Sequence, residues 1–188
     1  MESYTTIIIV IVVLIIFGII FGLIFSRRNR TERLQNQFGT EYDETVGRVG
    51  DDKKAQDELE NRQKHVDSLD IRPLSDDERE RYQADWAAVQ QKFVDQPGEA
   101  IVDADHMIME VMKLRNYPVS DFDQRAADIS VKYPNVVSNY RAARAISIKN
   151  IDKTADTEEL RTAMIHYRSL FDELLKSEST IKEEERVR

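Results

Sequence analysis

The sequence contains no cysteine among its 188 residues. Structural disulfides, thiolate-bound zinc, iron–sulfur clusters and cysteine nucleophiles are therefore all excluded. A chain of this length has room for a membrane anchor and one small domain.

The motifs of common catalytic sites are missing as well. There is no glycine-rich phosphate loop, no Gly-x-Ser-x-Gly nucleophile elbow, no His-Glu-x-x-His pair and no Glu-x-x-His pair of the di-iron kind. The best remaining constellation is His106 with Asp103 and Glu110, which would place three metal ligands on one helix face. The same residues form the polar strip of an otherwise apolar helix. We therefore favour a solvated face and expect no catalytic residue, metal or cofactor.

Basic residues are too few for a nucleic-acid-binding protein. The chain has 27 lysines and arginines against 35 aspartates and glutamates. The first thirty residues hold three arginines and one glutamate, so the remainder has 24 basic and 34 acidic residues, a net charge of −10. Phosphate backbones repel a domain of that charge, and no basic stripe with interleaved aromatic residues is present. We expect no nucleic-acid partner.

One long hydrophobic run stands out in this hydrophilic sequence. From Ile7 to Phe25, nineteen residues contain no charge, amide or proline. A helix of that length crosses about 30 Å of hydrocarbon. A cleaved signal peptide would instead have a basic leader, a shorter apolar core and a small-residue cleavage site, and none of these is present. We predict an uncleaved membrane anchor over residues 1–30, with the lipid bilayer as its partner.

The charges next to this run predict its orientation. The arginines that follow it are Arg27, Arg28, Arg30 and Arg33, whereas only Glu2 and the terminal amine precede it. Because flanking basic residues stay in the cytoplasm, we expect a single-pass protein with its N-terminus outside and its C-terminal domain cytoplasmic. The arginines could also bind anionic lipid headgroups, although their role in setting the topology is enough to explain their presence.

Gly18 and Gly22 form a small-xxx-small pair inside the run. Such a pair lets two helix backbones approach closely, which would give a homodimer through the transmembrane helix. Glycine is also common in membrane helices that make no such contact, so both interpretations stay open.

Beyond the run, apolar residues recur with the 3.6-residue period of a helix and never alternate as in a strand. We therefore predict an all-α protein, with one transmembrane helix followed by a small soluble multi-helix bundle. Residues 31–70 should form a juxtamembrane hinge and stalk helix. The cluster of Gly39, Gly47 and Gly50 marks the hinge.

The stalk helix should begin at Asp51, which can cap it, and run to about Leu69. Arg62 occupies one slot of its otherwise apolar heptad pattern, and we expect an amphipathic helix docked on the domain. The bundle is predicted over residues 71–176, and residues 177–188 are too charged to pack and should be disordered. Expected core residues are Tyr82, Trp86, Val89, Phe93, Ala100, Ile101, Ala104, Met107, Ile108, Val111, Leu114, Ala126, Ile129, Val137, Tyr140, Ile148, Leu160, Ala163, Met164, Tyr167, Leu170, Phe171 and Leu174.

Two charges fall at apolar positions of the predicted helices. Asp105 projects into the broad apolar face of the most hydrophobic helix, and Arg144 lies among Val137 and Tyr140 on another. An isolated buried charge costs too much free energy to persist. We expect Asp105 and Arg144 to form a buried ion pair with each other, or to pair with another buried polar group.

Several short motifs lie between Leu69 and Ala143. They are Asp70-Ile71-Arg72-Pro73-Leu74, Tyr82-x3-Trp86, Tyr117-Pro118-Val119, Phe122-Asp123-Gln124-Arg125-Ala126-Ala127-Asp128 and Asn139-Tyr140-Arg141. In these motifs the sequence resembles a group of uncharacterised bacterial membrane-anchored proteins. The resemblance implies a bacterial source, hence the inner (cell) membrane, and a self-contained domain. It carries no assigned activity and no functional residue.

The sequence favours a non-enzymatic module, tethered to the membrane, that binds or scaffolds a protein partner. The segment from Gly39 to Gly50 would set the reach of the tether. Residues 51–176 should then fold without the anchor, because each predicted helix has its own apolar stripe. The alternative is a metal-dependent enzyme or metal-binding module that uses Asp103, His106 and Glu110.

Overall fold

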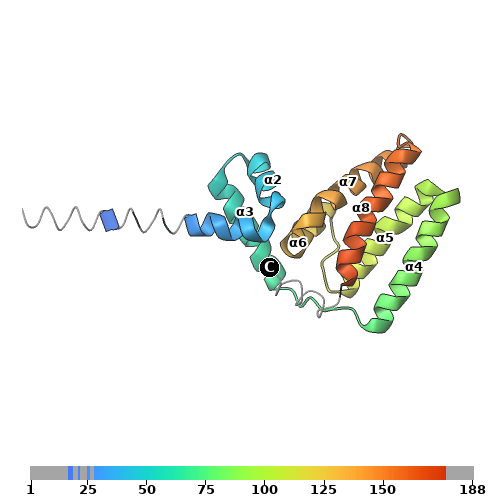
Figure 1. The fold of residues 1–188 in the computed structure, drawn as a ribbon, viewed down its shortest axis with the longest axis horizontal. Helices are drawn as coiled ribbons and strands as arrows, with labels where there is room; N and C mark the ends of the chain where they lie inside the picture. Colours follow the sequence, from blue (N-terminus) through green and yellow to red (C-terminus); the bar gives the residue numbers. More distant parts are fainter. Residues whose placement is uncertain (1–16, 19–20, 22–24, 26–27, 177–188) are drawn as a thin grey trace, which may run out of the picture.

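The computed structural model describes residues 17–18, 21, 25 and 28–176 of the chain. Across these residues every regular element is a helix and no strand occurs, so the predicted all-α class is confirmed for them (Figure 1). An unlabelled helix covers residues 28–38. The labelled helices are α2 (Thr40–Val49), α3 (Asp52–Asp67), α4 (Asp76–Asp95), α5 (Pro97–Leu114), α6 (Phe122–Lys132), α7 (Pro134–Ile151) and α8 (Thr157–Leu175).

Most of the predicted anchor and the whole predicted tail, residues 177–188, lie outside the described residues. Within the described part of the chain, no helix combines the length and apolarity that crossing a membrane requires. The described residues of the apolar run are helical. They include Phe17, Phe21 and Phe25, which are exposed, with the rings of Phe21 and Phe25 stacked 6.4 Å apart.

Residues 28–67 form a three-helix unit, made of helix 28–38, α2 and α3. The predicted stalk helix corresponds to α3, which Asp51 caps, and the glycine cluster predicted as a hinge lies within and between helices. Gly39 and Gly50 have positive φ angles of 51° and 72°, which let the chain reverse tightly between helices. Gly47 lies inside α2. The unit folds because its helices bury one shared set of apolar side chains, namely Leu34, Phe38, Tyr42, Leu59 and Val66.

Helices α4, α5, α7 and α8 build the bundle. Two of their starts have capping boxes that the local sequence provides, Ser75 with Glu78 in α4 and Asp156 with Glu159 in α8. Pro97 occupies the first turn of α5, which packs on α4 and α8 and carries the predicted buried face. Ile148, expected in the core, is exposed because α7 buries the neighbouring face instead.

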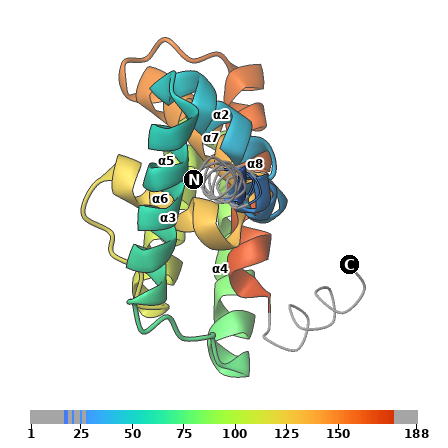
Figure 2. The same ribbon diagram turned by 90° about the vertical axis from the view of Figure 1, so that its left-hand side faces the viewer.

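The short helix α6 joins the two parts. Asp121 caps its first turn through a 2.9 Å hydrogen bond from the backbone amide of Gln124. One side of α6 packs on α7 and the other on α3, while α2 contacts α7. Figure 1 shows the three-helix unit on one side of α6 and α7, with α8, α5 and α4 on the other, and Figure 2 shows α2 and α3 in front of the bundle. We call the combined contacts of α3 with α6 and of α2 with α7 the joint.

Candidate functional site

The predicted metal constellation does not assemble. Asp103 Oδ2 accepts a 2.7 Å hydrogen bond from Lys92 Nζ, while His106 and Glu110 are exposed on α5. Nowhere in the described residues do three His, Cys, Asp or Glu side chains gather as metal ligands. The geometry therefore favours the solvated polar strip over the metal site.

Asp105 and Arg144 lie together, as the sequence led us to expect. Arg144 Nη1 donates to Asp105 Oδ2 at 3.2 Å, and the hydroxyl of Tyr167 donates to Asp105 Oδ1 at 3.0 Å. The side chains of Asp105 and Arg144 are 10% and 30% exposed. The pair is therefore only partly shielded from water, and the guanidinium also lies 5.7 Å from the ring centroid of Phe122.

Two of the arginines that follow the apolar run, Arg30 and Arg33, bind acidic side chains of α3. Arg30 donates to Asp57 at 2.6 Å and to Glu60 at 2.9 Å, and Arg33 donates to Glu60 at 2.6 Å. The hydrogen bonds that Arg30 donates to Glu60 and Asp57 raise the pKa of Arg30 above its usual value. These ion pairs fasten helix 28–38 to α3.

The remaining membrane-flank and glycine predictions are less fully described. Arg28 pairs with Glu32 on the exposed side of the same helix, and Arg27 lies outside the described residues. Gly18 is helical, and an added Cβ would meet nothing within 4 Å among the described residues. Gly22 lies outside the described residues, and the homodimer stays a prediction.

A buried carboxylate that sequence reasoning missed lies at the centre of the joint. Glu41 of α2 is 1% exposed. It accepts hydrogen bonds from Arg62 of α3 at 2.7 Å and from Arg141 of α7 at 2.6 and 2.8 Å. Burial raises the pKa of Glu41, but the hydrogen bonds from the two arginines outweigh it, and the pKa lies below its usual value.

Arg62 extends this network to two more side chains. It donates to Ser130 Oγ of α6 at 3.2 Å and pairs with Glu58 one turn earlier on α3. The one sequence signal for this network was the charged residue in an apolar slot of the heptad pattern. Nothing in the sequence near Glu41 or Arg141 indicated that these residues, about a hundred positions apart, would meet.

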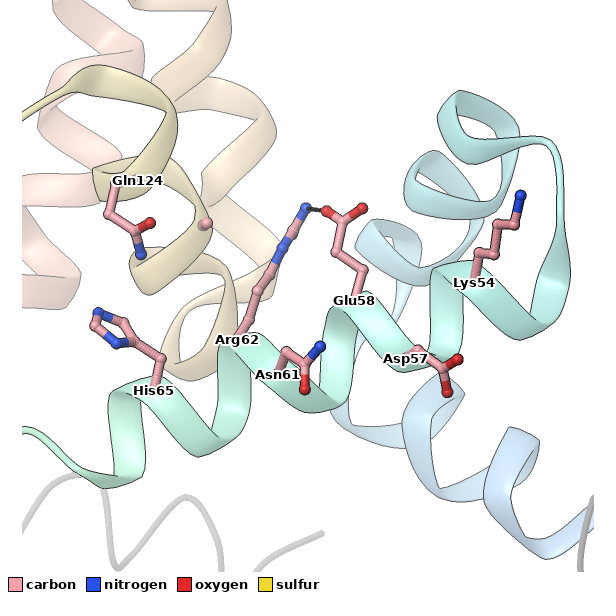
Figure 3. Close-up of a pocket in the computed structure, with 8 residues that line it drawn as sticks. Lys54, Asp57, Glu58, Asn61, Arg62, His65 and Gln124 are labelled. Atoms are coloured by element: carbon pink, nitrogen blue, oxygen red, sulfur yellow. Dashed lines mark hydrogen bonds and ion pairs between the residues drawn. The ribbon is translucent and has the colours of Figure 1, made fainter.

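A polar hollow of about 530 Å³ opens between α3 and α6 beside this network. It is lined by one face of α3, with spacings of three and four residues from Lys54 to His65, and by Gln124 and Ala127 of α6. Figure 3 shows His65 and Gln124 facing each other at one end, with Lys54 at the other. The complete lining is Lys54, Asp57, Glu58, Asn61, Arg62, His65, Gln124 and Ala127.

Asp128 of α6 is buried behind His65 and Gln124. Its Oδ1 accepts a 2.7 Å hydrogen bond from Gln124 Nε2 and lies 3.6 Å from His65 Nε2. Its Oδ2 is buried and has no hydrogen-bond partner in the described part of the chain. Burial raises the pKa of Asp128, and neither the Gln124 hydrogen bond nor the nearby His65 fully offsets that effect.

Comparison of the chain with known protein families, with curated proteins and with solved structures finds no match. The resemblance to bacterial membrane-anchored proteins therefore stays a prediction.

Proposed function

We propose that the protein is a single-pass, membrane-anchored helical module that binds or scaffolds a protein partner and catalyses no reaction. The apolar run from Ile7 to Phe25 supports the anchor, because nineteen residues without a charge are long enough to cross the hydrocarbon layer. The exposed large hydrophobic side chains of the module support a protein partner, since such side chains form the centres of interfaces. In the module these are Val94, Val102, Ile148, Ile151 and Ile165.

The observation that carries the proposal is the packing of the helix that follows the run. Leu34 and Phe38 of helix 28–38 are fully buried in the three-helix unit, and Arg30 and Arg33 pair with α3. A membrane span continued by this helix would hold the module at a defined orientation. We therefore propose a stiff attachment in place of the flexible tether that the glycines indicated.

We place the module on the cytoplasmic side of a bacterial inner membrane. The support is the arginine cluster after the run, which acts on the unfolded chain during insertion. The later pairing of Arg30 and Arg33 with acidic residues does not remove that signal, because acidic residues contribute little to it.

Membrane extraction and single-cysteine labelling test the anchor and its orientation. The chain has no cysteine, so Lys153→Cys, on an exposed turn, creates one labelling site. We expect the protein to stay in the membrane pellet after alkaline carbonate extraction. In intact cells the cysteine should resist a membrane-impermeant maleimide and react after permeabilisation. Release by carbonate would contradict the anchor, and labelling in intact cells would contradict the orientation.

Binding is tested by photo-crosslinking from the exposed apolar side chains in native membranes. A crosslinker at Ile151 should capture one defined protein, and a crosslinker at Lys132, an exposed lysine on α6, should not capture it. If both positions yield the same mixture, the apolar surface is not a specific contact. The proposal would then lose its support for a partner.

A further inference from the structure

The three-helix unit and the bundle have separate hydrophobic cores. Val131 of α6 is the single residue from α4–α8 among the buried members of the core of the three-helix unit, and Ile71 of the connector packs against both cores. The joint therefore depends largely on polar groups. Separating polar groups into water costs less free energy than exposing a hydrophobic core, so this contact can open while both parts stay folded.

The joint contains two polar contacts of different kinds. Glu41 with Arg62 and Arg141 keeps its charges near neutral pH, because arginine is always protonated and the pKa of Glu41 lies below its usual value. His65 Nε2 and Asp128 Oδ1 are 3.6 Å apart, longer than a hydrogen bond. Imidazole is the side chain whose charge ordinarily changes between about pH 5 and 8. The second contact alone can therefore respond to protons near neutrality.

Among the groups around Asp128, His65 is the partner whose charge can change. Arg62 is nearby but already binds Glu41, Glu58 and Ser130. Gln124 bonds Oδ1 and has no charge. The other titratable groups that act on this region are Asp121 at the start of α6, which repels the carboxylate, and Tyr117 after α5, whose pKa burial raises so that it stays neutral.

We propose that the His65–Asp128 pair is a proton-operated latch between the three-helix unit and the bundle. When the pair holds one proton, either an imidazolium N–H faces the carboxylate or the buried carboxyl is neutral, and the buried charge is relieved in both cases. When the proton leaves, an ionised carboxylate with an unpartnered oxygen remains buried. Opening the joint then lets water solvate that oxygen.

Protons reach this pair without unfolding of either part. His65 is 43% exposed and lines the end of the polar hollow (Figure 3). In this proposal, acidification from about pH 8 to about pH 5.5 adds the proton to the pair and tightens the joint. The latch is a property of the folded module and does not depend on the proposed membrane anchor.

The latch is tested by measuring the distance between α3 and α6 with spin labels. The full chain is used, reconstituted in lipid nanodiscs. Spin labels on Lys53→Cys and Lys132→Cys, both exposed, report the separation of the two helices. We expect one narrow distance distribution near pH 5.5 and an added longer population near pH 8. The ratio of open to closed molecules should grow by about tenfold or more, as for the loss of a hydrogen bond to a charged group. An unchanged distribution would overturn the proposal.

Three variants identify the sensor. Asp128→Asn keeps the shape without the charge, so its distribution should stay narrow at both pH values. In His65→Ala the distance distribution should keep its longer population near pH 5.5. The matched control is His106→Ala, which removes an exposed imidazole on α5 and should respond like the wild type. A response that survives Asp128→Asn, or is unaltered in His65→Ala, would overturn the latch.

Hydrogen exchange of the α3 amides in the unmodified protein gives a second readout that needs no substitution. Opening of the joint removes the packing of α6 against α3, which lowers the free energy of local unfolding of α3 although the three-helix unit stays folded. After correction for the intrinsic pH dependence of exchange, protection of α3 should therefore fall from about pH 5.5 to about pH 8. Protection of α5 and α8 should not change. Equal protection of α3 at both pH values would contradict the latch even if a variant failed to fold.

Discussion

Glu41 is a single carboxylate whose partners connect four helices. It lies on α2, binds arginines of α3 and α7, and reaches α6 through the bond from Arg62 to Ser130. Its loss would remove the carboxylate that both guanidinium groups share, leaving Arg62 with Glu58 and Arg141 with Glu44. We expect Glu41→Ala to lower the free energy of unfolding by about 3 kcal/mol, measured by denaturant titration of the detergent-solubilised protein. Glu44→Ala is the control, because Glu44 binds the same Arg141 at 3.1 Å but is half exposed, and it should cost less than about 1 kcal/mol.

The same carboxylate sets a pH dependence. The folded-state pKa of Glu41 lies below its usual value, so its contribution is fully present above the ordinary glutamate pKa of about 4.3. The contribution is lost as the pH falls from that value through the folded-state pKa. Stability of the wild type should therefore drop below about pH 4.3 more steeply than that of Glu41→Gln. If the stabilities of the two proteins fell in parallel with pH, the arginines would not favour the ionised form of Glu41.

Removal of Arg144 should cost an intermediate amount of stability, more than removal of an exposed arginine. Its partner Asp105 keeps the hydrogen bond from Tyr167 when the arginine is removed, and water reaches the guanidinium. We expect Arg144→Ala to cost about 1.5–3 kcal/mol, the range of a charged hydrogen bond. Arg161→Ala, which breaks an exposed pair with Glu158, should cost less than about 0.5 kcal/mol. Equal effects of the two substitutions would place Arg144 among ordinary surface arginines.

At the scale of elements, two glycines of one helix have opposite roles. Gly50 ends α2 in the left-handed region, so Gly50→Ala should destabilise by about 1 kcal/mol through backbone strain. Gly47 is helical, and an added Cβ meets nothing within 4 Å, so Gly47→Ala should stabilise by about 0.5–1 kcal/mol. Thermal unfolding of the two variants checks the signs. If neither substitution changed the stability, α2 would not be a stable helix.

The same helix shows where sequence reading stopped. A cluster of glycines predicts flexibility when each is taken alone. Gly39 and Gly50 instead supply tight reversals between helices that each bury only one or two side chains in the shared core. Those side chains become visible as a core only after helix 28–38, α2 and α3 are placed together.

At the scale of the whole molecule, the three-helix unit is needed for α3 to stay folded. A fragment of residues 51–176, first expected to fold by itself, would leave Leu59 and Val66 without Leu34 and Phe38. In residues 28–176, which keep Leu34 and Phe38, we expect α3 to stay folded. In the shorter fragment the amides of α3 should exchange freely while those of α5 and α8 stay protected, which hydrogen exchange would show. Full protection of α3 in both fragments would mean that the bundle alone holds it.

The sequence by itself determined the helical class, the capping boxes at Ser75 and Asp156, and the buried face of α5. These features depend on residues within a few turns of one another, whose physical effect is local. The joint was decided by tertiary structure alone. Glu41 meets Arg141 a hundred residues away, and Asp128 loses its solvent only because α3 packs over α6. Burial of a charge is a property of the assembled helices, and no local pattern of residues encodes it.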